Sequence, residues 1–332
     1  MKAKHILSGI RATGKLHLGH YHGTLKNWLD LQNAYECFFF VADWHALTTN
    51  YAHTENIALI TRNMVIEWLA VGIDPNKAHI YVQSQIPEIA EINLILGMIT
   101  PLGWLERVPT YKEQKQQQKD KDLTNFGFLG YPVLQAADIL SVKANKVPVG
   151  QDQVSHIEIA REIARRFNYI YGKGKVILPE PEALLTVMAT FPGLDGRKMS
   201  KSYDNTINLS DDVKTVEQKI LAMPTDPARV KRLDKGDPEK CPVWSLHKIY
   251  STQNEKDWVM HGCKTAEIGC IDCKKCLFKS IIEEQEPIQK RIMELQKNSA
   301  IVDDIILQGK KKAQEVASAV KDEIYTAVGL LK

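Results

Sequence analysis

The first half of the chain alternates apolar runs with amphipathic segments, and this alternation constrains the fold most. Residues 4–10, 36–48 and 78–84 are short apolar runs of the kind that form buried strands. Between them, residues 22–35 and 56–73 repeat apolar side chains at helical spacing. Such strand–helix–strand alternation predicts a parallel α/β sheet.

From about Leu209 onward, the predicted strands give way to helices. A strand at 147–149, followed by a glycine turn and an amphipathic helix, belongs to the first part. Helical spacing then marks four later segments, at residues 215–223, 242–250, 280–296 and 301–331. We therefore predict a doubly wound, Rossmann-like parallel sheet at 1–208 and an all-helical domain at 209–332.

Length and charge narrow the function classes. The chain has 332 residues, about the length of two domains, and 43 basic against 40 acidic residues leave a net charge of +3. This balance excludes a polycationic arm, so a nucleic acid would have to be bound by local patches. No apolar run approaches the roughly 20 residues of a membrane span. The first residues lack a signal-peptide core, and we expect a cytosolic protein.

Three histidines stand close together in KLHLGHYHG, residues 15–23. His17 and His20 are three apart, whereas a helical zinc site places its histidines four apart. The segment falls on the turn from the first strand into the first helix, where open parallel sheets bind nucleotide phosphates. Gly19 lets a base or ribose approach the backbone, and the two histidines can donate to phosphate oxygens. The alternative is a pair of capping or packing histidines.

A second segment carries lysines on a glycine-flanked loop. Residues 198–202 read KMSKS and follow Gly193 and Gly196. Such a loop can place two positive charges on a leaving pyrophosphate, a reaction that needs positioning and neutralisation rather than a covalent intermediate. Alone, the run would indicate a solvated charged surface; about 180 residues after the histidine turn it is far more specific. The polar stretch 111–127 predicts either a solvated loop or a mobile one that brings further lysines over an anionic substrate.

Together the two segments resemble the signatures of the class I aminoacyl-tRNA synthetases, an H-I-G-H turn and a K-M-S-K-S loop around ATP, with Leu18 in place of isoleucine. The resemblance implies that an amino-acid carboxylate attacks the α-phosphate of Mg-ATP, that pyrophosphate leaves, and that the aminoacyl group passes to a tRNA. By the same match, the catalytic residues would be His17, His20, Lys198 and Lys201.

Asp138 is the informative residue for the substrate. It stands in an otherwise apolar helical segment, where a carboxylate is costly unless a donor pairs with it. An indole N–H is a donor only and suits such an acceptor. A site of this kind would also reject amino acids that lack the donor. The alternative is that Asp138 caps a helix or pairs with a core arginine.

Four stretches, at residues 8–23, 103–114, 130–158 and 191–202, resemble the bacterial tryptophanyl-tRNA synthetases, in the family's order and over nearly the whole chain. The resemblance implies that Asp138 accepts the indole N–H. The tryptophan pocket would further comprise Leu7, His45, Tyr131, Gln135, Val147, Val149 and Gln153. ATP would be bound by Arg11, Ala12, Thr13, Gly19, His20, Gly150, Gln151, Asp152, Lys198, Met199, Ser200, Lys201 and Ser202. Two positions depart from the family: position 11 is Arg11 where glutamine is frequent, and position 135 is Gln135 where methionine is frequent.

Two rival functions share parts of this pattern. Tyrosyl-tRNA synthetases have the same fold and signatures, but their pocket pairs a phenol hydroxyl and their turn reads GG-x-D-Q rather than the VGQDQ of residues 149–153. Small nucleotidyltransferases also use HxGH but lack a second, helical domain. The family resemblance implies tRNA(Trp) and tryptophan as partners, and a homodimer.

Five of the six cysteines lie late in the chain, whereas Cys37 reads as a core residue. The stretch GCKTAEIGCIDCKKC, with one cysteine upstream, predicts a metal centre, and its spacing fits zinc or a four-iron cluster. The pattern resembles that of tryptophanyl-tRNA synthetases with a [4Fe-4S] cluster. That resemblance implies the ligands Cys241, Cys263, Cys270 and Cys273, with Cys276 as a spare or rival ligand because the first gap is one residue short. A nucleic-acid-binding module built around these cysteines is the non-enzymatic alternative.

Lysines border this cysteine pattern. Lys264, Lys274 and Lys275 can steer an RNA backbone toward it or simply form a solvated face.

Overall fold

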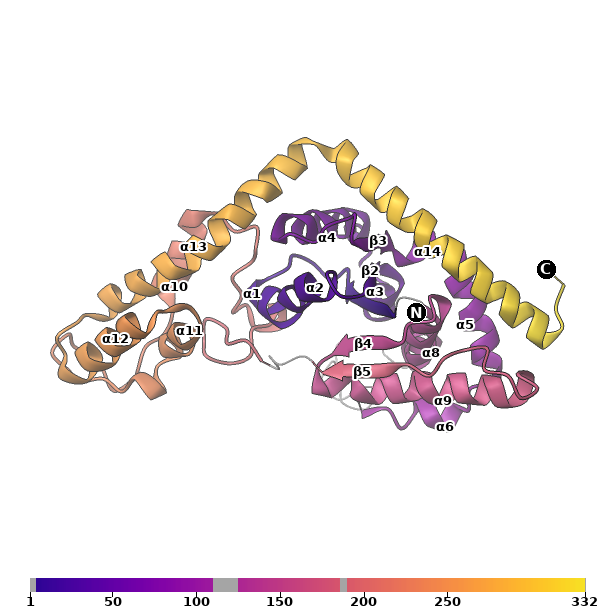
Figure 1. Cartoon of the computed structure of the whole chain (residues 1–332). Helices are drawn as coiled ribbons and strands as arrows, with labels where there is room; N and C mark the ends of the chain where they lie inside the picture. Colours follow the sequence, from indigo (N-terminus) through magenta and orange to yellow (C-terminus); the bar gives the residue numbers. More distant parts are fainter. Residues whose placement is uncertain (1–3, 110–124, 186–189, 332) are drawn as a thin grey trace. The chain divides into compact units, whose positions relative to one another are not determined.

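The structure is a computed structural model that describes residues 4–109, 125–185 and 190–331 (Figure 1). Most of the stretch 111–127, predicted as a loop, lies outside the described residues. The chain forms two compact units, which are described separately. The first comprises residues up to 14, residues 28–187 and residues 299–332, and the second comprises residues 15–27 and 188–298.

A parallel sheet of five strands organises the first unit, in the order β3-β2-β1-β4-β5. The strands are β1 (His5–Arg11), β2 (Glu36–Ala42), β3 (Ala78–Val82), β4 (Lys146–Val149) and β5 (Glu182–Leu185). The strand order reverses between β1 and β4, and open α/β sheets bind ligands beyond the carboxyl ends of the strands at such a switch point. The predicted fold class is therefore confirmed, with β5 as a strand that the sequence did not reveal.

Strand β2 shows why this sheet is covered on both faces. Its side chains alternate between the two faces. Phe38 and Phe40 enter the core formed with α5 (Pro87–Ile99), α8 (Phe126–Ser141) and α9 (Val154–Tyr171). Phe39, on the other face, stacks on Trp28 with ring centroids 4.1 Å apart. Both faces of β2 are therefore buried, each in its own core. This explains why the sequence of the strand is apolar throughout and does not alternate between apolar and polar residues.

Further helices complete the first unit and flank its sheet (Figure 1). They are α3 (Asp43–Asn50), α4 (Ile57–Val71), α6 (Leu102–Leu105) and α14 (Ser299–Val328), with the short turns η2 (Gln83–Gln85) and η3 (Gln151–Gln153). Helix α14 packs on β3 and α5. No helix in the described part of the chain is both long and apolar enough to cross a membrane.

The regular elements among the described residues of the second unit are all helical, apart from isolated β-bridges. It contains α1 (Leu18–His20), the π-helical turn η1 (Tyr21–Leu25), α10 (Val213–Ala222), α11 (Pro242–Tyr250), α12 (Gln253–Thr265), α13 (Cys270–Lys297), and the short turns η4 (Lys201–Tyr203) and η5 (Pro238–Lys240). Helix α2 (Lys26–Leu31) begins in this unit and ends in the first. The helices predicted within 209–298 are confirmed.

Packing divides the chain differently from the predicted boundary at residue 208. The last helix, α14, belongs to the sheet unit because Ala313, Ala317, Val320 and Ile324 are buried in the same core as Phe38. Gly309 lets this helix approach the backbone of β3 so closely that a Cβ would collide with the Ile80 carbonyl. Residues 15–27, in turn, pack with the helical unit. The functional division at 208 stays a prediction.

Candidate active site

The two signature segments lie together in the second unit, although about 180 residues separate them in sequence. The Leu18 N–H donates to the Ile207 carbonyl at 3.0 Å, and the Leu209 N–H donates to the Leu16 carbonyl at 2.9 Å. His17 and Asn208 form an antiparallel bridge between these bonds. The histidine segment is thus fixed by backbone pairing to the strand-like residues that directly follow the lysine loop.

Gly19 is the contact point of the two signatures. A Cβ placed on it would lie 2.9 Å from His17 Nδ1 and 3.5 Å from the Met199 Cβ. Met199 is buried, and its N–H donates to the Phe191 carbonyl at 2.8 Å. A side chain at position 19 would therefore crowd the His17 ring and reach van der Waals contact with Met199, so the close approach of His17 favours glycine here.

His17 and His20 are both held neutral. Their rings lie 3.7 Å apart, and the His17 N–H donates to His20 Nδ1 at 3.2 Å. Burial, with a smaller contribution from the charge of Lys201, lowers the pKa of His17 to about 4. The pKa of His20 is also lowered well below its ordinary value, by burial and by the charges of His17 and Lys201. Because Nδ1 of neutral His20 accepts a bond, its proton sits on Nε2, where it can be donated to a ligand.

Asn205 shapes the lysine loop, and sequence reasoning missed its role. It is 2% exposed, and its Oδ1 accepts the Ser200 N–H at 2.8 Å. Its amide nitrogen donates to Asp195 Oδ1 at 2.7 Å and to the Lys198 carbonyl at 3.2 Å. The side chain therefore bridges both arms of the loop. Lys198 is exposed, whereas Lys201 is half-buried in η4. Ser200 accepts the Ser202 N–H at 3.3 Å.

Asp138 lies in the first unit, on α8, and is fully buried. It accepts two bonds from Gln83 Nε2, at 2.8 and 3.0 Å, and one from His45 Nε2 at 2.9 Å. The Gln83 oxygen accepts the His45 N–H at 3.3 Å, which orients its amide nitrogen toward the carboxylate. Burial raises the pKa of Asp138, and the bonds from His45 and Gln83 oppose this rise. The partners are thus a histidine and a glutamine, not the arginine or helix cap of the alternative interpretation.

This network sits at the carboxyl edge of the sheet, because His45 follows β2 and Gln83 follows β3. Gln83 was not predicted, and only its place directly after a strand could have indicated it. Another unpredicted partner is His156 on α9, whose Nε2 lies 2.5 Å from the Tyr131 hydroxyl. The other predicted pocket residues also lie in this unit. Leu7 and Val147 are buried in the sheet, and Gln135, Val149 and Gln153 are half-buried.

The residues predicted to bind ATP fall into two groups, one in each unit. Arg11, Ala12 and Thr13 end or follow β1, and Gly150, Gln151 and Asp152 follow β4, so both sets lie at the carboxyl edge of neighbouring strands. The second unit contributes the other group, Gly19, His20, Lys198, Met199, Ser200, Lys201 and Ser202.

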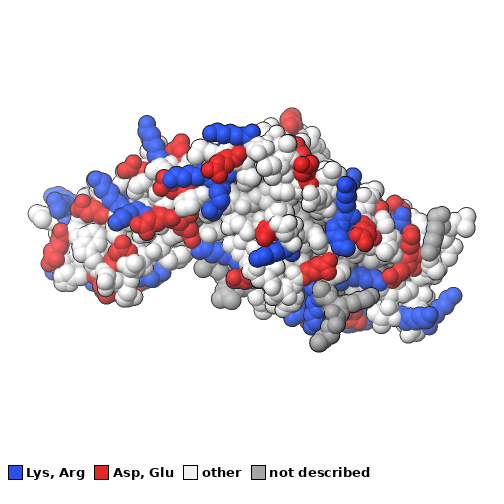
Figure 2. Space-filling model, turned by 45° about the horizontal axis from the view of Figure 1, so that its top comes forward, with Lys and Arg blue, Asp and Glu red and all other residues white. Residues whose placement is uncertain are grey.

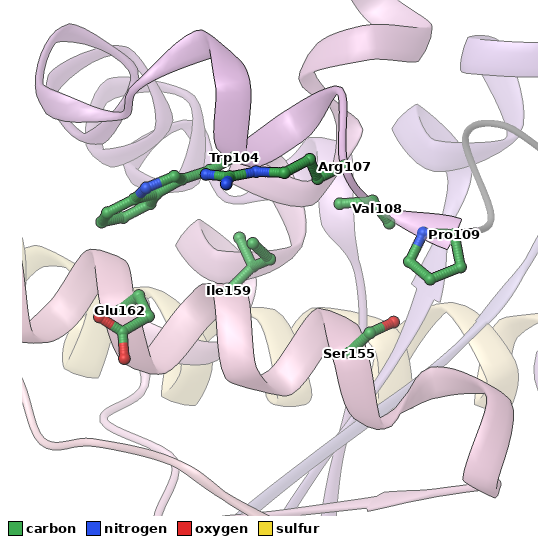
Figure 3. Close-up of a pocket in the computed structure, with 7 residues that line it drawn as sticks. All are labelled: Trp104, Arg107, Val108, Pro109, Ser155, Ile159 and Glu162. Atoms are coloured by element: carbon green, nitrogen blue, oxygen red, sulfur yellow. The ribbon is translucent and has the colours of Figure 1, made fainter.

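A separate cavity of about 330 Å³ opens between α9 and the segment that begins with α6 (Figure 3). Trp104 and Arg107 face Ile159 and Glu162 across it. The remaining lining residues are Val108, Pro109 and Ser155. It contains no residue that the sequence predicted for the active site.

The five late cysteines gather around the N-terminus of α13. Cys241 caps α11, Cys263 lies on α12, and the other three, Cys270, Cys273 and Cys276, follow one another along the first turns of α13. Burial raises the pKa of Cys273, and the other four cysteines are close enough to raise it further. Nevertheless, no three His, Cys, Asp or Glu side chains among the described residues stand in a metal-binding arrangement. The ligand set therefore stays a prediction.

Two nitrogen-bearing side chains contact these thiols. Arg229 Nη1 donates to Cys263 Sγ at 3.6 Å, and His247 Nε2 lies 3.3 Å from Cys273 Sγ. Cys37, by contrast, is fully buried in β2, as predicted for a core residue.

Among the nearby lysines, Lys274 is not available to RNA. It is buried and donates to the Leu221 and Met223 carbonyls at 2.7 and 2.6 Å. Lys264 and Lys275 are exposed. Basic and acidic side chains are interspersed over the face seen in Figure 2, as expected from the small net charge.

Comparison with known proteins gives consistent relatives. A model of the family "tRNA synthetases class I (W and Y)" matches residues 2–284. A tryptophan–tRNA ligase of Thermotoga maritima is 53% identical over 98% of this chain and 99% of its own, and one of Ralstonia nicotianae is 45% identical over 99% of each. A crystal structure of tryptophanyl-tRNA synthetase from Campylobacter jejuni, complexed with ADP and tryptophan, superposes with a TM-score of 0.89 at 32% identity and covers 98% of this chain and 100% of that one.

Proposed function

Because this chain belongs to the class I tRNA synthetases for tryptophan and tyrosine, and is a tryptophan–tRNA ligase, we propose roles for its residues in that reaction. The enzyme activates L-tryptophan with Mg-ATP to tryptophanyl-AMP and pyrophosphate, and then transfers tryptophan to tRNA(Trp). For the tyrosine-specific alternative, the likeness to an Archaeoglobus fulgidus tyrosyl-tRNA synthetase at 23% identity supports the common fold alone.

The backbone pairing of the two signatures carries the proposal for catalysis. It places Lys201 within electrostatic reach of the neutral pair His17 and His20. We infer that the histidine N–H groups and the charges of Lys198 and Lys201 stabilise the phosphates as the tryptophan carboxylate attacks and pyrophosphate leaves. Each such contact contributes on the order of 3 kcal/mol to the transition state. The strand-end groups 11–13 and 150–152 would hold the nucleotide.

Asp138 supports the choice of tryptophan. Its carboxylate has acceptor capacity left beside the bonds from His45 and Gln83. An indole N–H can use that capacity, whereas a phenylalanine side chain would leave it unpaired. Leu7, Val147 and Val149 would enclose the ring, with Tyr131, Gln135 and Gln153 nearer its polar end.

The experiment for this function is ATP–pyrophosphate exchange with tryptophan, with tyrosine and without an amino acid. We expect exchange with tryptophan alone. Exchange with tyrosine would keep the fold and the mechanism but overturn the role of Asp138. Absence of exchange in folded protein would favour the nucleotidyltransferase alternative.

For the cysteines, we propose a [4Fe-4S] cluster held by Cys241, Cys263, Cys270 and Cys273, with zinc as the alternative. The proposal is supported by the charge interaction of Cys273 with the other four thiols and by the nitrogen neighbours Arg229 and His247, which can donate to thiolates. A bound cluster would tie α11, α12 and α13 together. Iron, zinc and sulfide analysis of protein purified without oxygen decides between the two.

We also propose that the enzyme is a cytoplasmic homodimer. Four large apolar side chains stay exposed on the neighbouring helices α5, α6 and α8, namely Leu94, Met98, Leu102 and Phe126. Exposed apolar groups of this kind mark association surfaces. Sedimentation equilibrium at micromolar concentration tests the proposal, and a monomer there would contradict it.

A further inference from the structure

The third histidine of the first signature segment, His22, has no part in the H-x-G-H motif. Its side chain is only 6% exposed, although it lies on the π-helical turn η1. One face of its ring stacks on Phe191, with centroids 4.7 Å apart and planes at 25°. Its Nε2 lies 2.9 Å from Glu284 Oε2 and 2.8 Å from the Tyr250 hydroxyl. All of these residues belong to the second unit.

Glu284, on α13, holds this turn at two points. Besides His22, it binds Lys26 Nζ through Oε1 at 2.6 Å, directly after the turn. A carboxylate can only accept, so Nε2 of His22 carries its proton. Burial alone would raise the pKa of Glu284, but hydrogen bonds and charge from His22 and Lys26 outweigh it and lower the pKa to about 2. The carboxylate is therefore charged throughout the neutral range.

The network continues into the second signature. The Phe191 ring stacks on His22, the Phe191 carbonyl accepts the Met199 N–H at 2.8 Å, and the Met199 Cβ lies 3.5 Å from the position that a Cβ on Gly19 would take. A chain of contacts thus runs from Glu284 through the histidine turn to the lysine loop. π-Helical turns are rare in regular helices and concentrate at functional sites, where their geometry needs support from neighbours.

We propose that Glu284 is a positioning residue for adenylate formation, which keeps the turn at His22 in place and thereby holds the two signatures in their mutual geometry. The inference rests on the proposed activation reaction. Glu284 touches no substrate in this role. It acts through His22 and Lys26, and its loss misplaces His20 and the loop at 198–202 relative to each other.

The test is Glu284→Gln, with Glu286→Gln as the matched control. Glu286 lies on the same helix and pairs with Lys290 at 3.0 Å, but it contacts neither signature. We expect Glu284→Gln to lower the rate of tryptophanyl-AMP formation per active site by roughly 10- to 100-fold, as for a displacement of about 1 Å of reacting groups. The KM for tryptophan should stay within twofold, and the control should match the wild type in both.

Active-site titration separates positioning from stability. A purely structural role would reduce the number of competent sites and the melting temperature but leave the rate per site unchanged, and that result would overturn the proposal. Should Glu284→Gln not fold, His22→Phe can keep the stack on Phe191 while it removes the bonds to Glu284 and to the Tyr250 hydroxyl, so a wild-type rate per site in that variant would overturn the proposal equally. Absence of exchange in the wild type would instead refute the proposed function itself.

Discussion

The buried carboxylate of Asp138 and the half-buried thiols around Cys273 differ in how far neighbouring donors compensate their removal from water. Asp138 is surrounded by donors from its own unit, His45 and Gln83, which compensate its burial. Cys273 has His247 as a polar neighbour, and both burial and the other thiols raise its pKa. The donors in the chain already compensate the acceptor at Asp138, whereas a metal of the kind proposed above would take the thiols as thiolates and remove their protons.

The largest effect is expected from a substitution of Asp138. Asp138→Asn replaces an acceptor oxygen by an NH₂ group that faces the donors of His45 and Gln83. Leaving buried donors unpaired costs several kcal/mol, so kcat/KM for tryptophan should fall by roughly 10²- to 10³-fold. The measurement is exchange kinetics with tryptophan and phenylalanine in parallel, with folding checked by circular dichroism. An unchanged preference for tryptophan would place Asp138 outside the pocket.

For the cysteines, the substitution that corresponds to Asp138→Asn is Cys273→Ser. We expect iron, or zinc, to be lost from this variant, because a serine hydroxyl does not replace a thiolate ligand at neutral pH. Metal binding to the folded state stabilises it, so the melting temperature should fall as well. Cys276→Ser is the control on the same helix and should retain the metal. If the metal is lost from Cys276→Ser but retained in Cys241→Ser, then Cys276 is a ligand in place of Cys241.

A smaller effect is expected when only one donor to Asp138 is removed. Gln83→Met keeps the volume but deletes the two bonds to the carboxylate, while His45 remains. A hydrogen bond to a charged group contributes about 1.5–3 kcal/mol, so kcat/KM for tryptophan should drop roughly 10- to 100-fold. Gln85→Met, an exposed residue of the same turn, is the control. Equal kinetics in the two variants would show that His45 alone orients Asp138.

Sequence patterns predicted the elements of this molecule well but not their partners. The apolar runs located β1 to β3, although residues 43–48 of the second run belong to helix α3 and not to a strand. Helical spacing located α10, α11, α13 and α14. Strand β5 was missed because its side chains are half-buried or exposed and leave no apolar run. The destination of α14 was missed too, since periodicity shows that a helix has a buried face but not which core receives it.

The candidate site shows the same limit at single residues. His17, His20 and the lysine loop were found by local motifs, and Asp138 by being charged in an apolar segment. Asn205 and Gln83 are ordinary polar residues in sequence. Gln83 acts through a contact with Asp138, which is distant along the chain, and Asn205 acts through the orientation of its amide group. Neither property produces a periodic pattern in the sequence.

The signature histidines extend the comparison to a third buried group, with the smallest expected effect. In the folded protein, burial and, to a smaller extent, the charge of Lys201 lower the pKa of His17 from its ordinary value of 6.5 to about 4. Between pH 6.5 and 4, His17 is therefore protonated in the unfolded chain but neutral in the folded protein. The free energy of unfolding is not reduced by this difference above pH 6.5, and it falls as the pH is lowered from 6.5 toward 4. At pH 5.5 the loss is about 1 kcal/mol for this histidine.

Urea unfolding of the wild type and His17→Gln at pH 7.5 and 5.5 measures this contribution. We expect the free energy of unfolding of the wild type to fall more between the two pH values than that of the variant, by about 1 kcal/mol. Parallel curves for the two proteins would mean that His17 is protonated in the folded state, and its ring would then meet a phosphate as a cation rather than as a neutral donor.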